Sequence, residues 1–148
     1  MTYVILIYLF PLNRASDGGS LILPCEVAVK SVVPAVKALM AKELLEKRGL
    51  TQEEVAGILG VSQSAVSKYT RNVRGYAVKI DDVAEIETLI AKMIDLLMNG
   101  TYKRAELLRC FCRTCIAIRK TSIMCQLCRK TDPNIRIEEC GFCQFSDI

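Results

Sequence analysis

Residues 52–69 read Gln52-Glu-Glu-Val-Ala-Gly-Ile-Leu-Gly-Val-Ser-Gln-Ser-Ala-Val-Ser-Lys-Tyr69, and this stretch decides the fold. Thr51 precedes it and Glu54 follows three residues later, which is the pattern of a capping box at the start of a helix. Gly60 can adopt the positive φ that ends a helix in a tight turn. Ser62 is of the residue type that caps a second helix. The stretch therefore predicts two short helices, ending near Leu59 and near Tyr69 or Arg71.

The side chains of this stretch divide into an inward and an outward set. Ala56 is small where two helices would cross, and apolar residues fall where a three-helix core needs them: Val55, Leu59, Val61, Val66 and Tyr69. The outward face of the second helix would carry Ser62, Gln63, Ser64, Ser67, Lys68 and Arg71. An ordinary helical hairpin explains the turn but does not require this polar face. A short helix with hydrogen-bonding side chains and one or two cations is typical of a helix that enters a DNA major groove.

On these residues the stretch resembles the phage-repressor (XRE-like) family of helix-turn-helix transcriptional regulators. The resemblance implies that Gln52 binds a phosphate and supports Gln63, which reads a base, with adenine as the natural partner of an amide. It further implies base or backbone contacts from Ser64, Ser67 and Lys68. Arg71 and Arg74 are interpreted as phosphate contacts. The expected partner is double-stranded DNA.

Helical periodicity continues on both sides of this stretch. A long amphipathic helix is predicted from Ser31, as its N-cap, to Arg48, with Gly49 as its stop. A short extended segment is expected at Tyr76–Ile80, a helix with a wide apolar stripe at Asp81–Asn99, and a further helix from Tyr102 to about Arg109. From Cys110 onward periodicity weakens, which suggests a segment organised by metal.

The predicted fold is mainly α: a helix-turn-helix bundle followed by a small cysteine-rich metal-binding C-terminal module. We expect an N-terminal apolar segment at 1–22, a DNA-binding domain with a dimerisation helix at 23–100, and the cysteine-rich module at 101–148. The apolar run Met1–Leu12 is too short to cross a bilayer, which takes about 20 apolar residues. We interpret it as a strand or a loosely attached tail, so no membrane partner is expected.

Composition excludes several kinds of chemistry. The 148 residues contain no histidine, which removes Ser-His-Asp triads and zinc sites with mixed cysteine and histidine ligands. The net charge is +4, and a basic segment at 28–80, an acidic segment at 81–100 and a second basic segment at 101–148 follow one another. A thiol oxidoreductase usually places its Cys-x-x-Cys in a βαβ context, which is not found here. The chain is therefore predicted not to be an enzyme, and no small-molecule substrate is inferred.

Seven of the eight cysteines lie within a short C-terminal segment. Because nothing resembles a secretory signal, we expect a cytoplasmic protein, and clustered cysteines there indicate metal binding before disulfides. The candidate ligands are Cys112, Cys115, Cys125, Cys128, Cys140 and Cys143, with Cys110 as a further candidate. Basic residues that could offset thiolate charge lie among them: Arg113, Arg119, Lys120, Arg129 and Lys130.

The metal and its four ligands stay open at this point. Cys112, Cys115, Cys125 and Cys128 could close one site, or the last pair could close it with the first. Zinc is preferred slightly because closed all-cysteine zinc sites are common. A [4Fe–4S] cluster also takes four thiolates and suits an uneven run with surplus cysteines. The metal would either fold the segment or sense redox state or metal supply.

A wider resemblance extends from Leu23-Pro-Cys-Glu26 through the helix-turn-helix to Cys143. Over this range the chain is similar to a group of archaeal predicted regulators of XRE type with a cysteine-rich tail. The expected function is sequence-specific, DNA-binding transcriptional regulation by a homodimer, responsive to redox state or metal through the cysteines. The alternative is a protein-interaction adaptor with a structural zinc module and a vestigial helix-turn-helix.

Overall fold

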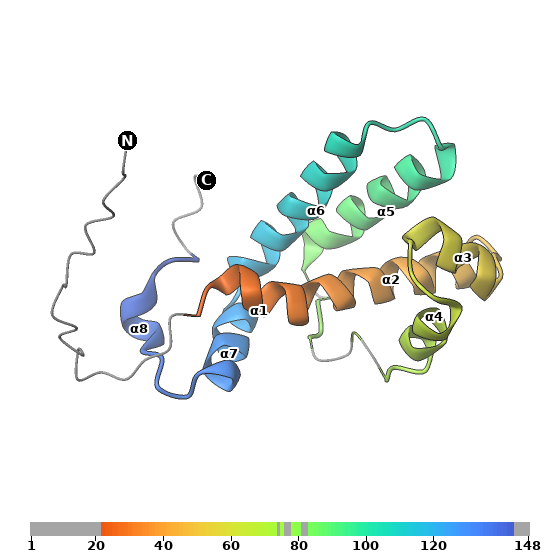
Figure 1. The fold of residues 1–148 in the computed structure, drawn as a ribbon. Coiled ribbons are helices and arrows are strands. Elements are labelled where there is room, and N and C mark those ends of the chain that lie inside the picture. The colour runs from red at the N-terminus through yellow and green to blue at the C-terminus, as the bar shows by residue number, and fades with distance from the viewer. Residues whose placement is uncertain (1–21, 74, 76–77, 81–82, 144–148) are drawn as a thin grey trace, which may run out of the picture.

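The computed structural model describes residues 22–73, 75, 78–80 and 83–143, and this part of the chain is mainly helical with no strand. Its helices are α1 (Pro24–Lys30), α2 (Val32–Glu46), α3 (Gln52–Leu59), α4 (Gln63–Thr70), α5 (Ala84–Asn99), α6 (Arg104–Arg119), α7 (Ser122–Thr131) and α8 (Ile137–Cys140) (Figure 1). The predicted all-helical class is confirmed. None of these helices has both the length and the apolar character that a membrane crossing needs. The expected N-terminal strand or tail, and Arg74, lie outside the described residues.

Helices α1 and α2 follow one another and form the central rod of the molecule (Figure 1). Helices α3 and α4 pack at one end of this rod, while α7 packs against α1 at the other end. The rod is interrupted at Ser31, whose hydroxyl donates a hydrogen bond to the Val27 carbonyl at 2.6 Å. Ser31 is therefore the N-cap residue of α2, as expected, but its side chain does not cap that helix. Helix α1 was not expected; it begins with Pro24, which is well suited to a first helical position.

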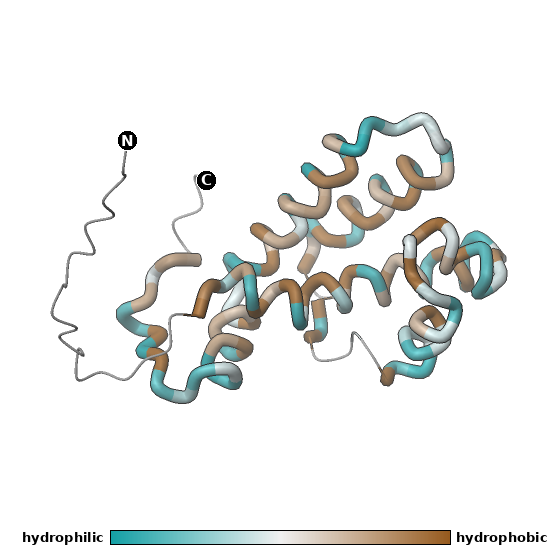
Figure 2. The backbone as a smooth tube through the Cα atoms, in the orientation of Figure 1, coloured by the Kyte–Doolittle hydropathy of each residue, from teal (hydrophilic) through white to brown (hydrophobic). Residues whose placement is uncertain are grey.

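One hydrophobic cluster holds these helices together. Figure 2 shows apolar residues recurring along α2 and α5, as expected for helices buried on one face. The largest side chains that are almost fully buried come from both sides of residue 100: Met40, Leu44, Val55, Val66, Ile80, Ile86, Met93, Ile94, Ile118 and Met124. The division at residue 100 stays a prediction, but core residues on either side of it belong to the same cluster.

The helix that carries the first cysteines is longer than expected. Helix α6 continues from Arg104 to Arg119 instead of ending near Arg109. Cys110, Thr114 and Ile118 recur every four residues on its buried face, so the expectation of lost periodicity after Cys110 is wrong. Cys110 and Thr114 are therefore core residues of this helix. Helix α6 packs along α5, with Gly100 in the left-handed conformation at the end of α5.

The segment after α4 returns to the rod through a close contact. Gly75 has a φ of +80°, and a Cβ added there would lie 2.7 Å from both the Ala38 Cβ and the Pro34 carbonyl oxygen. The backbone at residue 75 therefore lies directly against α2. Val78 and Ile80, further along, are buried, but no strand forms among the described residues of the expected extended segment.

Candidate functional site

The first helix of the helix-turn-helix starts at the predicted capping box. The Glu54 amide donates to the Thr51 hydroxyl oxygen at 3.3 Å, and the Thr51 amide donates to the Glu54 carboxylate at 2.8 Å. These two bonds satisfy amide groups that a helix start leaves without partners. The pKa of the Glu54 carboxyl is lowered below its ordinary value, because the Thr51 amide and the Thr51 hydroxyl both donate to the ionised carboxylate.

The turn between α3 and α4 has the predicted geometry. Gly60 lies in the left-handed region with a φ of 60°, and the Val61 amide donates to the Ala56 carbonyl at 3.0 Å. Ala56 and Ala65 are buried where the two helices meet, and larger side chains there would push them apart. Val55 and Val66, each adjacent in sequence to one of these alanines, are fully buried. The turn is thus fixed by small residues at the crossing and by left-handed backbone at Gly60.

Helix α4 begins at Ser62, whose side-chain oxygen accepts a hydrogen bond from the Ala65 amide at 3.2 Å. The Ser62 and Ser64 hydroxyl oxygens are 3.0 Å apart and share a hydrogen bond. Ser62 is therefore engaged as the helix cap. Gln63 and Ser64, in the first turn of α4, are exposed to solvent.

The remaining predicted DNA-binding residues are placed as follows. Lys68 is exposed on α4, Ser67 is half-buried, and Gln52 is half-buried at the start of α3. Arg71 is exposed, but its Nε donates to the Ser67 carbonyl at 3.3 Å, so its side chain folds back over the end of α4. Gln63, Ser64 and Lys68 thus form an exposed polar face, here called the α4 face.

The eight cysteines separate into three groups. Cys110 is buried in the core. Its carbonyl accepts a hydrogen bond from the Thr114 hydroxyl at 2.9 Å. Cys115 of α6 lies near Cys112 of the same helix and near Cys25 of α1. The pKa of the Cys115 thiol is raised, mainly by burial and further by Cys25 and Cys112, while Arg119 opposes the shift. The Arg119 Nη1 is 4.0 Å from the Cys25 sulfur.

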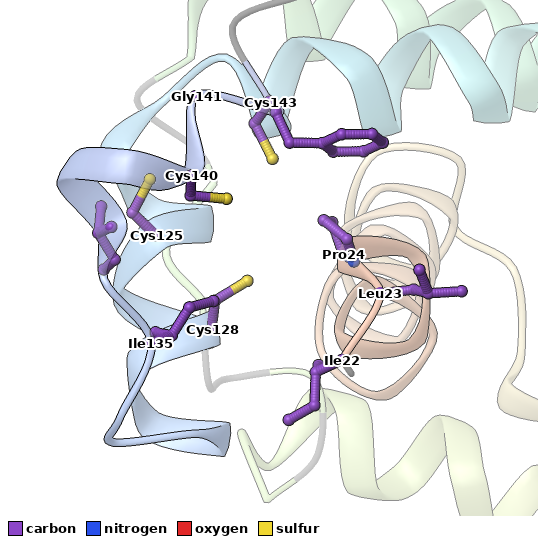
Figure 3. Close-up of a pocket in the computed structure, with 11 residues that line it drawn as sticks. Ile22, Leu23, Pro24, Cys125, Cys128, Ile135, Cys140, Gly141 and Cys143 are labelled. Carbon is purple, nitrogen blue, oxygen red and sulfur yellow. The ribbon is translucent and has the colours of Figure 1, made fainter. Parts of the chain in front are cut away.

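The third group consists of Cys125, Cys128, Cys140 and Cys143, which line one cavity of about 230 Å³. Figure 3 shows Cys128, Cys140 and Cys143 turning their sulfur atoms toward the space between the α7–α8 segment and Pro24 at the start of α1. The pKa of the Cys128 thiol is raised, first by burial and then by the neighbouring Cys143, Cys125 and Cys140. We call this the cysteine cavity.

The cysteine side chains of the described residues do not form a complete site for a single metal ion. Across the described ranges, no three cysteine, aspartate or glutamate side chains converge closely enough to hold one metal ion. The predicted ligands Cys112 and Cys115 are grouped with Cys25 and do not line the cysteine cavity, whereas the last two Cys-x-x-Cys pairs line it together.

Sequence reasoning missed three parts of this region: the wall formed by Ile22, Leu23 and Pro24, the position of Cys25, and the contact of Arg119 with Phe142. The Arg119 guanidinium carbon lies 5.2 Å from the centre of the Phe142 ring. The run Leu23-Pro24-Cys25-Glu26 was noticed only as part of a resemblance. Nothing in its spacing indicated that it would meet residues about a hundred positions away, because such contacts depend on the whole topology.

Comparison with known proteins assigns the central part of the chain. Residues 42–90, about a third of the chain, match the family model described as Helix-turn-helix. This segment runs from within α2 to within α5 and is similar to helix-turn-helix domains of the XRE type. Neither the curated proteins nor the solved structures contain a significant match. The resemblance to an archaeal group stays a prediction.

Proposed function

We propose that this protein is a sequence-specific DNA-binding transcriptional regulator that reads a major groove with the α4 face. The observation that supports this most directly is the exposure of Gln63, Ser64 and Lys68 on a helix whose opposite side is locked into the core by Ala65, Val66 and Tyr69. A rigid helix with an exposed amide in its first turn suits base recognition, because a glutamine can bond two edges of an adenine.

Phosphate contacts would hold α4 in register. Gln52 at the start of α3 and Lys68 on α4 would serve this role, and a helix N-terminus itself favours an anion. Arg71 would first have to leave its bond to the Ser67 carbonyl. Binding that depends on such contacts weakens steeply with salt, which a protein-interaction adaptor with a vestigial helix-turn-helix would not show.

We also propose a homodimer, because one recognition helix reads too few base pairs for specific regulation. The apolar stripe of α5, expected as the dimer element, is buried against its own chain at Ile86, Leu89, Ile90, Met93 and Ile94. A dimer through α5 would therefore use its other residues. The predicted response to metal or redox state is likewise part of the proposal, and the cysteine cavity supports it.

The test is selection of bound sequences from a random double-stranded DNA pool, followed by affinity measurements on the selected site with wild type and Gln63→Ala. We expect Gln63→Ala to weaken specific binding by about 1–3 kcal/mol, or about 5- to 150-fold, while non-specific binding stays unchanged. Gln126→Ala makes the same chemical change at an exposed position of α7 and should leave affinity unaltered.

Two results would contradict the proposal. Equal affinity of Gln63→Ala and wild type would show that α4 does not read bases. If the pool enriches no sequence, and the weak binding that remains does not change with salt concentration, the alternative function as a protein-interaction adaptor is favoured. Enriched sites should be inverted repeats with centres about 34 Å apart if the protein binds as a dimer across one helical turn.

A further inference from the structure

The cysteine cavity lies at the α1 end of the rod, away from α3 and α4, and DNA binding gives it no role (Figures 1 and 3). Its wall joins two parts of the chain that are distant in sequence. Ile22, Leu23 and Pro24 form one side, and α7, α8 and the turn after α8 form the other. Four of the eleven lining residues are cysteines, in two Cys-x-x-Cys pairs. Four cysteines in two Cys-x-x-Cys pairs give this cavity a set of ligands that suits a metal group.

The spacing of the thiols distinguishes between two kinds of occupant. Tetrahedral zinc holds four sulfurs about 3.8 Å from one another, since each lies about 2.3 Å from the ion. No three metal-binding side chains of the described residues come together in that way, although four cysteines surround one cavity. An iron–sulfur cluster fills volume with its own iron and sulfide atoms, so its cysteine ligands stand further apart. A cavity of about 230 Å³ whose four thiols do not converge on one point suits a cluster better than a single ion.

Arg119 supplies an independent observation beside the same cavity. Its guanidinium lies over the ring of Phe142, which is one of the lining residues. Its Nε is buried and has no hydrogen-bond partner among the protein atoms. An unpaired buried donor is destabilising, and a cation at this place would stabilise an anionic group of thiolates. The Arg119 Nη1 lies 4.0 Å from the Cys25 sulfur, so the Nε is the donor that remains for a sulfur of the cluster or of its ligands.

The rest of the wall is apolar. Ile22, Leu23, Pro24, Ile135, Ile137 and Phe142 surround the thiols. Apolar walls limit the access of water to a cluster and help to set its potential. Cys128 is itself buried and belongs to the hydrophobic cluster of the protein, so an occupant bound there would be attached directly to the core.

We propose that Cys125, Cys128, Cys140 and Cys143 bind a [4Fe–4S] cluster in the cysteine cavity. Cys112, Cys115 and Cys25 form a separate group on α6 and α1 that is not part of this site, and Cys110 is a core residue. The cluster would link α7 to α8 and would pack against Ile22, Leu23 and Pro24. This site deepens the metal response included in the proposed function, but its existence does not depend on DNA binding.

The experiment uses the full chain, purified without oxygen and then supplied with equal amounts of ferrous and ferric iron and with sulfide, which together have the oxidation level of the cluster. We expect about four irons and four sulfides per chain, with a broad visible absorption band. Cys128→Ser and Cys140→Ser should lose this band and most of the iron. The double variant Cys112→Ser/Cys115→Ser makes the same change at another Cys-x-x-Cys pair and should keep both. Helical circular dichroism of every variant shows whether loss of iron follows from loss of fold.

Each alternative result has a definite meaning. About one zinc per chain, with no iron uptake and no visible band, would overturn the cluster in favour of a mononuclear site. Loss of iron in Cys112→Ser/Cys115→Ser but not in folded Cys140→Ser would overturn the choice of ligands. Failure of the folded wild type to take up any metal would overturn the site altogether. These measurements contain no DNA, so a failed DNA-binding proposal would leave them unaffected.

Discussion

Gly75 shows how much can depend on a residue without a side chain. Its backbone has a φ of +80° and lies against Pro34 and Ala38 of α2, so two independent constraints require glycine there. The contact returns the chain to the central rod after α4 and so helps to hold α4 in place. Sequence reasoning predicted an extended segment directly after Gly75 but not this contact.

Gly75→Ala should lower the free energy of unfolding by about 2–4 kcal/mol, because left-handed backbone strain and overpacking against α2 add together. Chemical denaturation followed by circular dichroism measures this. Gly57→Ala is the matched control: Gly57 is in helix α3, nothing lies within 4 Å of an added Cβ, and alanine is the better helix former. That variant should be as stable as wild type or more stable, by up to about 1 kcal/mol. Equal stability of Gly75→Ala and wild type would show that the contact is not needed.

At the scale of single elements, sequence reasoning was most successful where the determinants are local. The Thr51–Glu54 capping box, the left-handed Gly60 and the Ser62 cap are each defined by neighbouring residues, and each was found. Sequence reasoning did not predict α1, and it predicted a helix shorter than α6. In α6 the buried face is made of Cys110, Thr114 and Ile118, and two of these residues were not counted as apolar. The cysteines had been assigned to metal as a group, although only tertiary packing distinguishes a core cysteine from a ligand.

The capping box of α3 makes stability depend on pH in a predictable direction. The pKa of Glu54 is lowered in the folded protein, so the unfolded chain binds a proton more readily. The stabilisation is therefore complete above the unfolded pKa of about 4.3 and is lost as the pH falls through the lower folded pKa. Glu54→Gln should lower the melting temperature at pH 7, and the difference from wild type should shrink at acidic pH. Glu53→Gln, also exposed in the first turn of α3, should show a smaller pH-dependent difference. A Glu54→Gln difference that stays constant with pH would exclude this role.

At the scale of the whole molecule, the central rod connects the cysteine cavity to the α4 face. Ile22–Pro24 line the cavity, α1 continues into α2, and α2 packs against α3 and α4. The cavity itself could not be predicted from the sequence. The spacing of the cysteines allowed several pairings, and only the topology shows that the last two pairs share one space.

We expect removal of the proposed cluster to weaken specific DNA binding by about 5-fold or more, because the first residues of α1 would lose their packing against the cluster. The measurement compares cluster-loaded wild type, wild type before cluster loading and Cys140→Ser on the selected DNA, with Cys112→Ser/Cys115→Ser as control. Identical affinities with and without the cluster would show that the two ends of the rod act separately.

The cysteine cavity is lined by Ile22–Pro24 and by residues between Cys125 and Cys143, and the ribosome makes these two segments at different times. A ribosome adding about 5–20 residues per second would need about 5–20 seconds to make the hundred or so residues between them. Residues 51–70 emerge well before that, and their helices are joined by local bonds. The helix-turn-helix could thus fold while Leu23 and Pro24 are still exposed, because the residues of the other cavity wall have not yet been synthesised. Iron delivery would then be the last step of maturation, and a shortage of iron would leave chains whose reading half is complete but whose cavity is not.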